Sequence, residues 1–354
     1  MNTTTLKTLR HYIQPEQESD LEEVIRIFKE SLLLLANETL IPRTSYRYTI
    51  RPLITDCHTE CLEDNSVIRI KRSKTTKPVI GIDSTCITLA ESKKGLVLAI
   101  RASIVILNSK HFFIKRVGPA IVYVTEETIN WLSEQLSFPK IYLRMAPVDP
   151  RYAKKLLMES LELIMLHETV SFYDNCIILR DGSLREPEIQ YKKFPFRKIV
   201  RNALRRDNII IGISKRSNLF KWCFSYLSKL SRVPPPVAIA IPDATRYFDD
   251  LWGDVYFALF DNRGIPLRVD ILSILEPEYC LNLLYSSDLF RTGYPETLRR
   301  AHIYSKIVSS ERLSLQLSLA KYCLRFVHCE RERELLFGAF NKTTGDWNKI
   351  ETSK

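Results

Sequence analysis

Apolar positions gather in short blocks along the chain, and the blocks most typical of strands begin at residue 79. Residues 79–82, VIGI, predict a buried strand that ends on Asp83. Two further apolar runs, 95–107 and 112–124, are rich in β-branched side chains and are separated by polar turns. Because no helical pattern lies between them, the three runs predict an antiparallel meander.

Other segments show helical spacing of their apolar residues. The predicted helices are 19–36, 126–136, 150–170 and 296–326, the last being long, amphipathic and basic. Ser19 and Glu22 have the spacing of a capping box at the first of them. Further short apolar runs predict strands at 176–179, 209–213, 237–241, 255–260 and 267–275.

The order of these elements indicates the fold class. Three strands, then helices, then strands mixed with helices are typical of an α/β protein whose mixed β-sheet is flanked by helices. The chain lacks the regular strand–helix alternation of a Rossmann fold. It also has neither GxGxxG nor GxxxxGK[ST], so the usual nucleotide-binding motifs are absent.

Composition narrows the class of protein. The 354 residues are 45% hydrophobic and 26% charged, which suits a sizeable core and excludes a mostly disordered chain. Lys and Arg number 52 against 41 Asp and Glu, and the net charge of +11 favours polyanionic partners. No apolar run reaches the ~18 residues of a membrane span, and residues 1–20 lack the apolar core of a signal peptide. We therefore expect a cytoplasmic protein without membrane contact.

The eight cysteines are far apart in mostly apolar surroundings, so we expect free, buried thiols. Cys57 and Cys61 form one half of a zinc-type spacing, but no second Cys/His pair follows at a matching distance. Residues 64–78 contain a short strand and then a basic connector. Both a phosphate-contacting surface and a solvated linker fit that connector.

Two acids follow buried strands in matching positions. Asp83 follows VIGI, and Asp181 follows the apolar run 176–179. If those strands are neighbours, both carboxylates leave the sheet at one edge, where a hard divalent cation would bind them. Two such ions can activate water for phosphodiester cleavage. The alternative is that both acids simply begin turns, as Asp often does.

Four motifs in order give a resemblance. They are 81–85 (GIDST), 179–184 (LRDGSL), 212–217 (GISKRS), and 293–295 (GYP) followed by 301–302 (AH). Together they resemble the NurA nuclease family of archaea and bacteria, whose members have a ribonuclease H-like fold and process DNA ends. The first motif has Asp-Ser-Thr where Asp-Gly-Ser is commoner in the family.

The resemblance runs from about residue 79 to residue 326 and implies a domain organisation. Residues 1–75 would be an N-terminal extension with a small helical part and the basic connector. Residues 76–330 would form the ribonuclease H-like nuclease domain, and 331–354 a C-terminal tail.

The resemblance also implies a metal site. Asp83, Asp181 and His302 match family ligands, and a glutamate on the helix before Asp181 would complete the set. We assign that glutamate to Glu162, beside the apolar stripe of the helix. Glu159 is the alternative, and Glu168 comes third.

Other residues of the motifs have expected roles in binding the substrate. Lys215 follows a buried strand, so its ammonium would reach the edge of the acids and hold the scissile phosphate. An exposed lysine in a basic turn is the alternative. Tyr294 would position water or phosphate, the alternative being that it only caps the packing of the helix. Lys215, Arg216 and Arg299 would bind DNA.

The function implied is a metal-dependent DNA nuclease with one or two Mn²⁺ ions, Mg²⁺ being the alternative metal. The resemblance implies 5′→3′ exonuclease and single-strand endonuclease activity in DNA end resection and double-strand break repair. It also implies a homodimer that works with the hexameric HerA translocase. A non-catalytic DNA-binding or scaffold subunit is the alternative from another class, and a ribonuclease or resolvase would share the metal chemistry.

Overall fold

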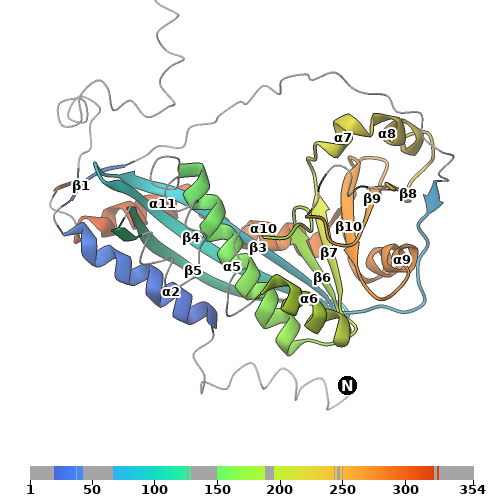
Figure 1. Cartoon of the computed structure of the whole chain (residues 1–354), viewed down its shortest axis with the longest axis horizontal. Coiled ribbons are helices and arrows are strands. Elements are labelled where there is room, and N and C mark those ends of the chain that lie inside the picture. The colour runs from blue at the N-terminus through green and yellow to red at the C-terminus, as the bar shows by residue number, and fades with distance from the viewer. Residues whose placement is uncertain are drawn as a thin grey trace, which may run out of the picture.

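The computed structural model describes residues 20–36, 38–42, 67–125, 127–128, 150–187, 195–242, 244, 248, 250–322 and 325–326. Figure 1 shows the arrangement of their helices and strands. In chain order these are α2 (Asp20–Glu30), the 3₁₀ helix η2 (Ser31–Leu35), β1 (Thr39–Pro42), β2 (Ile68–Arg69), β3 (Val79–Glu91), β4 (Gly95–Asn108), β5 (His111–Thr125), α5 (Pro150–Phe172), β6 (Ile177–Asp181), α6 (Phe196–Arg205), β7 (Ile209–Ser214), α7 (Leu219–Trp222), α8 (Phe224–Leu230), β8 (Val237–Ala240), β9 (Asp254–Leu259), β10 (Leu267–Leu272), α9 (Pro277–Ser287), β11 (Phe290–Arg291), β12 (Tyr294–Pro295), α10 (Glu296–Ser305), α11 (Ser309–Leu319) and β13 (Arg325–Phe326).

A mixed sheet of eleven strands organises the described residues. β3, β4 and β5 form the predicted antiparallel meander. β6 and β7 continue the sheet parallel to β3, and β10, β9 and β8 follow in antiparallel order. The mixed sheet flanked by helices, with a helix ahead of it, is confirmed.

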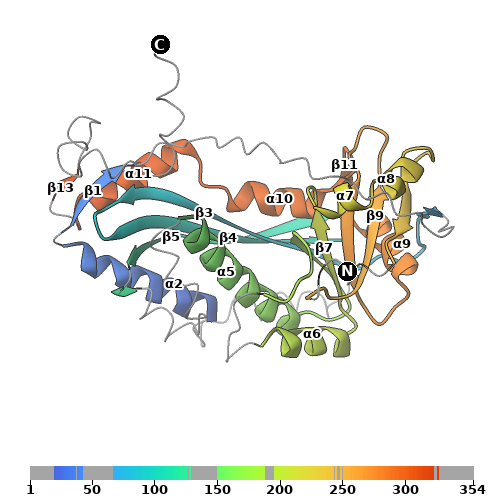
Figure 2. The same cartoon turned by 45° about the horizontal axis from the view of Figure 1, so that its top comes forward.

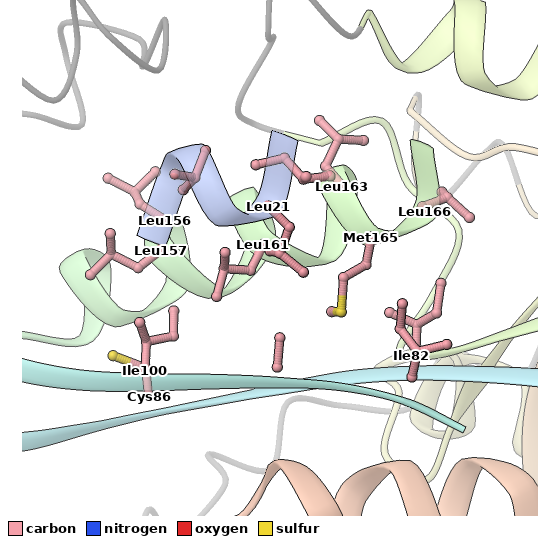
Figure 3. Close-up of a cluster of buried hydrophobic side chains, with 14 of the residues drawn as sticks. Leu21, Ile82, Cys86, Ile100, Leu156, Leu157, Leu161, Leu163, Met165 and Leu166 are labelled. Atoms are coloured by element: carbon pink, nitrogen blue, oxygen red, sulfur yellow. The ribbon is translucent and has the colours of Figure 1, made fainter. Parts of the chain in front are cut away.

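Helices cover both faces of this sheet. α2, α5 and α6 lie on one face, and α10 and α11 lie on the other (Figure 2). Leu161 and Met165 of α5 point toward the sheet, where Ile82 and Ile100 belong to the same buried cluster (Figure 3). Burial of such side chains contributes about 1.5–3 kcal/mol each, so this layer holds α5 firmly against β3 and β4.

Asp83 does not end its strand, and that prediction is wrong. β3 continues to Glu91, because the polar side chains after Asp83 find partners on the covering helices. Ser84 donates a hydrogen bond to Glu162 of α5 (2.8 Å), and Thr85 lies 3.1 Å from the hydroxyl of Ser305 on α10. Pairing with β6 nevertheless stops at Ile82, one residue before Asp83.

The single helix predicted over 296–326 is also wrong, because the helix breaks between Ser305 and Ser309. The buried guanidinium of Arg101, on β4, donates hydrogen bonds to the carbonyl of Lys306 (3.0 Å) and to both oxygens of Glu311. Glu311 also accepts the amide of Val308 (3.0 Å), which caps α11. Contacts from a distant strand therefore replace the hydrogen bonds of a continuous helix.

The basic connector is packed along α9. The amides of Lys71, Ser73 and Lys77 donate hydrogen bonds to Asn282, Ser286 and Ser287 at 2.6, 2.6 and 3.0 Å. These contacts order the backbone of the connector, while the side chains of Lys71 and Lys74 remain exposed.

The remaining expectations divide into three groups. The strands predicted between 176 and 275 are confirmed within a few residues, whereas the helices α6, α7, α8 and α9 were not predicted. Cys86, Cys176, Cys223 and Cys280 are buried and form no disulfide within the described part of the chain, as predicted. Cys57, Cys61 and most of the helix predicted at 126–136 lie outside the described residues. No helix in the described part of the chain has the length and apolar character to cross a membrane.

We predict that Glu311→Gln lowers the free energy of unfolding by about 1–2 kcal/mol, because it weakens the bidentate contact that compensates the buried guanidinium of Arg101. The loss stays below that of a fully buried ion pair, since about a third of the Glu311 side chain, 34%, is exposed. Urea unfolding at neutral pH measures it. Glu30→Gln is the matched control, because it removes an exposed i,i+4 pair with Arg26, worth about 0.3–0.5 kcal/mol.

Acidification should reduce this difference. The hydrogen bonds from Arg101 hold the pKa of Glu311 at about 2. Because this lies below the ordinary value, the stabilisation is complete above about pH 4.5 and is lost as the pH falls toward 2. Unfolding curves of wild type and Glu311→Gln should converge over that range, and a difference independent of pH would contradict the ion pair.

Candidate metal centre

Three of the predicted ligands come together at one place in the fold. Asp83 of β3, Asp181 at the end of β6 and His302 of α10 each offer an atom, and these atoms all lie within 4.8 Å of one another. The parallel pairing of β3 with β6, in which Ile82 lies opposite Arg180, sets the two aspartates side by side. The strands are neighbours, as the proposed site requires.

The carboxylate of Asp83 is buried and held from α10. Ser305 donates a hydrogen bond to its Oδ2 (2.6 Å), and Nδ1 of His302 lies 3.2 Å from the same oxygen. This contact with Asp83 raises the pKa of His302 above its ordinary value. Sequence analysis did not identify Ser305, although its place three residues after His302 puts both side chains on one face of the helix.

α10 can hold these side chains because it lies close against β3. A Cβ at Gly81 would lie 2.9 Å from the carbonyl oxygen of Thr297, so only glycine allows this approach. Ser103 of β4 donates a hydrogen bond to the carbonyl of Ala301 (2.6 Å). The buried carboxylate of Asp288 accepts the amide and hydroxyl of Thr297, which caps the first turn of α10.

Asp181 faces Lys215 and Tyr294. Burial raises the pKa of Asp181; the charge of Asp83 raises it further, and the ammonium of Lys215 opposes both. Lys215 Nζ lies 3.6 Å from an oxygen of Asp181 and 4.2 Å from the centre of the Tyr294 ring. The buried hydroxyl of Tyr294 has no hydrogen-bond partner among the described residues. Burial and the nearby aspartates raise its pKa, so it remains a proton donor.

Two motif glycines let the Asp181 and Lys215 loops come together. Gly182 has φ +109°, a conformation that L side chains rarely adopt. A Cβ at Gly212 would lie 2.7 Å from the Gly182 carbonyl oxygen and 3.0 Å from the Leu184 nitrogen. The backbone of this loop therefore requires glycine at position 212.

A buried ion pair on β10 contacts both the loop after Asp181 and the loop after Lys215. Arg268 donates to both oxygens of Asp270, at 2.7 and 2.9 Å. Asp270 also accepts the amide of Leu184 (2.8 Å), and Arg268 lies 3.4 Å from the hydroxyl of Ser217. Sequence analysis did not identify either residue of the pair, because residues 268–270 (RVD) read as part of an ordinary short strand.

Glu162 does not belong to the cluster of three. Residues of β3 point alternately to the two faces, so Asp83 faces α10 while Ser84 faces α5. Glu162 accepts hydrogen bonds from Ser84 (2.8 Å) and from Arg180 (3.2 Å). Burial raises its pKa, and the charge of Asp83 adds to that effect across the sheet.

The other two glutamates considered lie on either side of Glu162 along α5, in different surroundings. Glu159 lies 3.8 Å from Lys155. Glu168 accepts the amide of Leu21 (3.2 Å) and so holds the beginning of α2. Neither belongs to the group of possible ligands in the described part of the chain.

Two predicted DNA contacts lie outside this cluster. Arg216 is exposed immediately after Lys215. Arg299 makes a bidentate contact with Glu296, at 2.6 Å to each oxygen, and Arg300 shares the same carboxylate. The guanidinium of Arg299 is therefore already held by an acid of its own helix.

The donor set of the cluster fits a divalent cation. Two carboxylates and one imidazole suit Mn²⁺ better than Mg²⁺, which prefers oxygen ligands alone. The raised pKa of Asp181, from burial and from Asp83, indicates a site where added positive charge would be stabilising. Asp83, Asp181 and His302 are the residues that would hold such an ion.

We predict that Mn²⁺ raises the melting temperature of the protein through this cluster. A ligand at a hundredfold excess over its Kd stabilises by about 2.7 kcal/mol. Asp181→Asn should lose most of the shift, because the amide is a weaker ligand without charge. Asp254→Asn, an exposed acid at the start of β9, should keep it. Equal shifts in all three proteins, measured by thermal unfolding, would place metal binding elsewhere.

Gly212→Ala should lower the free energy of unfolding by about 1–3 kcal/mol, because the new methyl group would meet backbone atoms that cannot rotate away. It should also weaken Mn²⁺ binding, since the Asp181 loop must shift. Ser183→Ala in the same loop is the control and should change stability by less than about 0.5 kcal/mol. Denaturant titration and calorimetry measure both quantities, and a neutral Gly212→Ala would show that the loops are not in such close contact.

Comparison with known proteins gives the following similarities. Among solved structures, the NurA nuclease from Sulfolobus solfataricus aligns at 20% identity over 73% of this chain and 86% of that chain, with a TM-score of 0.47. A second NurA structure aligns at 12% identity over 76% and 92% (TM-score 0.44), and endonuclease V from Bacillus subtilis at 10% over 73% and 88% (TM-score 0.35). No curated protein sequence gives a significant match.

The family model is the stronger finding, because it covers most of the chain. The predicted mixed sheet flanked by helices is confirmed, with two parallel strands following the antiparallel meander. The model of the NurA domain matches residues 77–307 of the 354. The chain therefore belongs to the NurA family.

Proposed function

We propose that this protein is a metal-dependent nuclease that hydrolyses phosphodiester bonds in DNA. The observation that supports it most is the convergence of Asp83, Asp181 and His302 within 4.8 Å, from three elements far apart in sequence. Two acids so close repel each other, so their placement suits a cation between them.

The residues around the cluster have separate tasks in this proposal. A bound divalent ion would activate water and stabilise the leaving oxygen. Ser305 orients the carboxylate of Asp83, and Asp270 holds the loop that follows Asp181. Lys215 would attract the scissile phosphate and Tyr294 would donate a hydrogen bond to it, since its buried hydroxyl has no partner in the described structure.

Glu162 remains our proposed fourth ligand. Its carboxylate is close enough for the charge of Asp83 to raise its pKa. To ligate the ion it would exchange the hydrogen bonds of Ser84 and Arg180 for the metal. Glu159, beside Lys155, is the alternative.

The finer assignments follow the family resemblance. We propose 5′→3′ exonuclease and single-strand endonuclease activity, with one or two Mn²⁺ ions, in DNA end resection and double-strand break repair. The protein would act in the cytoplasm as a homodimer with a HerA-type hexameric translocase. Residues 76–330 would form its nuclease domain, with Lys215, Arg216 and Arg299 contacting DNA.

We predict that cutting of end-labelled DNA requires Mn²⁺ or Mg²⁺ and stops with chelator. Asp83→Asn and Asp181→Asn should each lose at least about 100-fold, because even outer-shell partners of a metal are worth 10–100-fold. Asp254→Asn is the control with the same change of charge. Strands labelled at the 5′ or the 3′ end give the polarity, and matched RNA strands separate a ribonuclease.

Equal residual cutting in wild type and both ligand variants would indicate a contaminating nuclease. The protein would then be a DNA-binding or scaffold subunit on a nuclease fold. Loss of activity in only one ligand variant would mean that the metal site is not formed by both aspartates.

A further inference from the structure

The outer face of α6 carries charge of a single sign. The inner face of this helix packs into the core beneath the sheet through Phe196, Ile199, Val200 and Ala203. The outward positions recur with helical spacing and are Arg197, Lys198, Arg201, Asn202 and Arg205. We call these five residues the α6 stripe.

The α6 stripe borders a hollow in the surface. A cavity of about 430 Å³ is lined by the whole stripe together with His167 of α5, Pro195 and Ile199. None of the described residues that line it is acidic. The stripe is therefore a concave basic surface, which concentrates positive potential more than a flat one would.

Among the described residues, most of these cations have no acid to compensate them. Lys198, Arg201 and Arg205 make no ion pair within the described part of the chain. Arg197 reaches Glu186 at 3.5 Å while 73% of its side chain stays exposed. A solvated helix face usually mixes both signs of charge, so this stripe calls for another explanation.

We propose that the α6 stripe binds the phosphodiester backbone of DNA at a site separate from the metal centre. Arg197, Arg201 and Arg205 recur every four residues, which spreads their guanidinium groups over roughly 12 Å of helix. One strand of duplex DNA presents a phosphate about every 3.4 Å of its axis while its backbone also winds around that axis, so the stripe matches roughly two or three phosphates. Guanidinium groups bind phosphate oxygens in pairs, which favours arginine for this task.

DNA fits the α6 stripe better than an acidic protein would. Protein interfaces gain most of their affinity from apolar or aromatic anchors at their centre. No large apolar side chain is exposed along the α6 stripe. Nucleic-acid surfaces, in contrast, consist mainly of basic and amide side chains directed at phosphates.

The position of the stripe decides which part of the DNA it would hold. α6 lies beside α5, on the face of the sheet opposite α10 (Figure 2). His302 of the metal centre lies on α10, so one nucleotide cannot contact both places. The stripe would therefore bind DNA away from the cleaved bond. This inference rests on the proposed function only in taking DNA as the substrate.

The test compares two double variants with the same change of net charge. Arg201→Glu/Arg205→Glu reverses two charges of the stripe, and Lys110→Glu/Lys115→Glu reverses two exposed charges of the β4–β5 hairpin. Binding of fluorescein-labelled single-stranded and duplex DNA is measured with chelator present, so that nothing is cut. We expect the stripe variant to bind about tenfold more weakly near 0.1 M salt, and the control to change less than twofold. For single strands, log affinity against log salt should become shallower by about 1.4, or 0.7 for each lost phosphate contact.

Hydrolysis of bis(p-nitrophenyl) phosphate with Mn²⁺ separates this inference from the proposed function. This small diester reports on the metal centre and does not reach α6, so the stripe variant should hydrolyse it like wild type. If wild type hydrolyses neither the diester nor DNA, the proposed function fails while the binding comparison still stands. Equal DNA binding by the stripe variant and the hairpin control would overturn the α6 site. Should the Glu variant fail to fold, Arg201→Gln/Arg205→Gln replaces it, with Lys110→Gln/Lys115→Gln as its control and the same two outcomes.

Discussion

The contact between α10 and β3 is the constraint on which the candidate site depends. Gly81 lets the helix backbone come so close to the strand that His302 and Ser305 reach the carboxylate of Asp83. Asp288 caps the start of the helix, and Arg101 ends it through the carbonyl of Lys306. Without this approach the histidine would be an ordinary exposed residue of a surface helix.

β3 also divides the acids of the site between two faces. Asp83 faces α10 and Glu162 faces α5, so the strand separates them while leaving their charges close enough to interact. Each has its own hydrogen-bond donor, Ser305 on one face and Ser84 on the other. The adjacent residues Asp83 and Ser84 of β3 therefore contact different helices. These contacts explain why the strand continues through polar residues, which are of types that often end a strand.

Much of this arrangement could be predicted from local pattern and motif order. Apolar runs gave the strands, and the matching positions of Asp83 and Asp181 after two such runs pointed to one edge of the sheet. The helix break at Lys306 could not be found this way, because Arg101, which stabilises it, lies 205 residues earlier in the chain. The face of Glu162 was equally hidden, since a helical wheel shows which side of α5 is buried but not which strand residue lies beneath it.

Burial raises the pKa of Asp181, Glu162 and Asp270, and that of Asp288 to about 7. A neighbouring acid adds to this effect at every one of them except Asp270. The folded protein therefore holds more protons on these groups than the unfolded chain does, and their contribution to stability falls as the pH rises from about 4 to 7.

Nearby cations that are held in place oppose this cost of ionising the buried acids, as Arg268 does at Asp270 and Arg180 does at Glu162. Lys215 does so only partly at Asp181, because its 3.6 Å contact is long and 41% of its side chain is exposed. Asp181 therefore differs from the other three acids. It lies beside a second carboxylate and a histidine, and its counter-charge, Lys215, is held loosely, so it is available to an incoming cation.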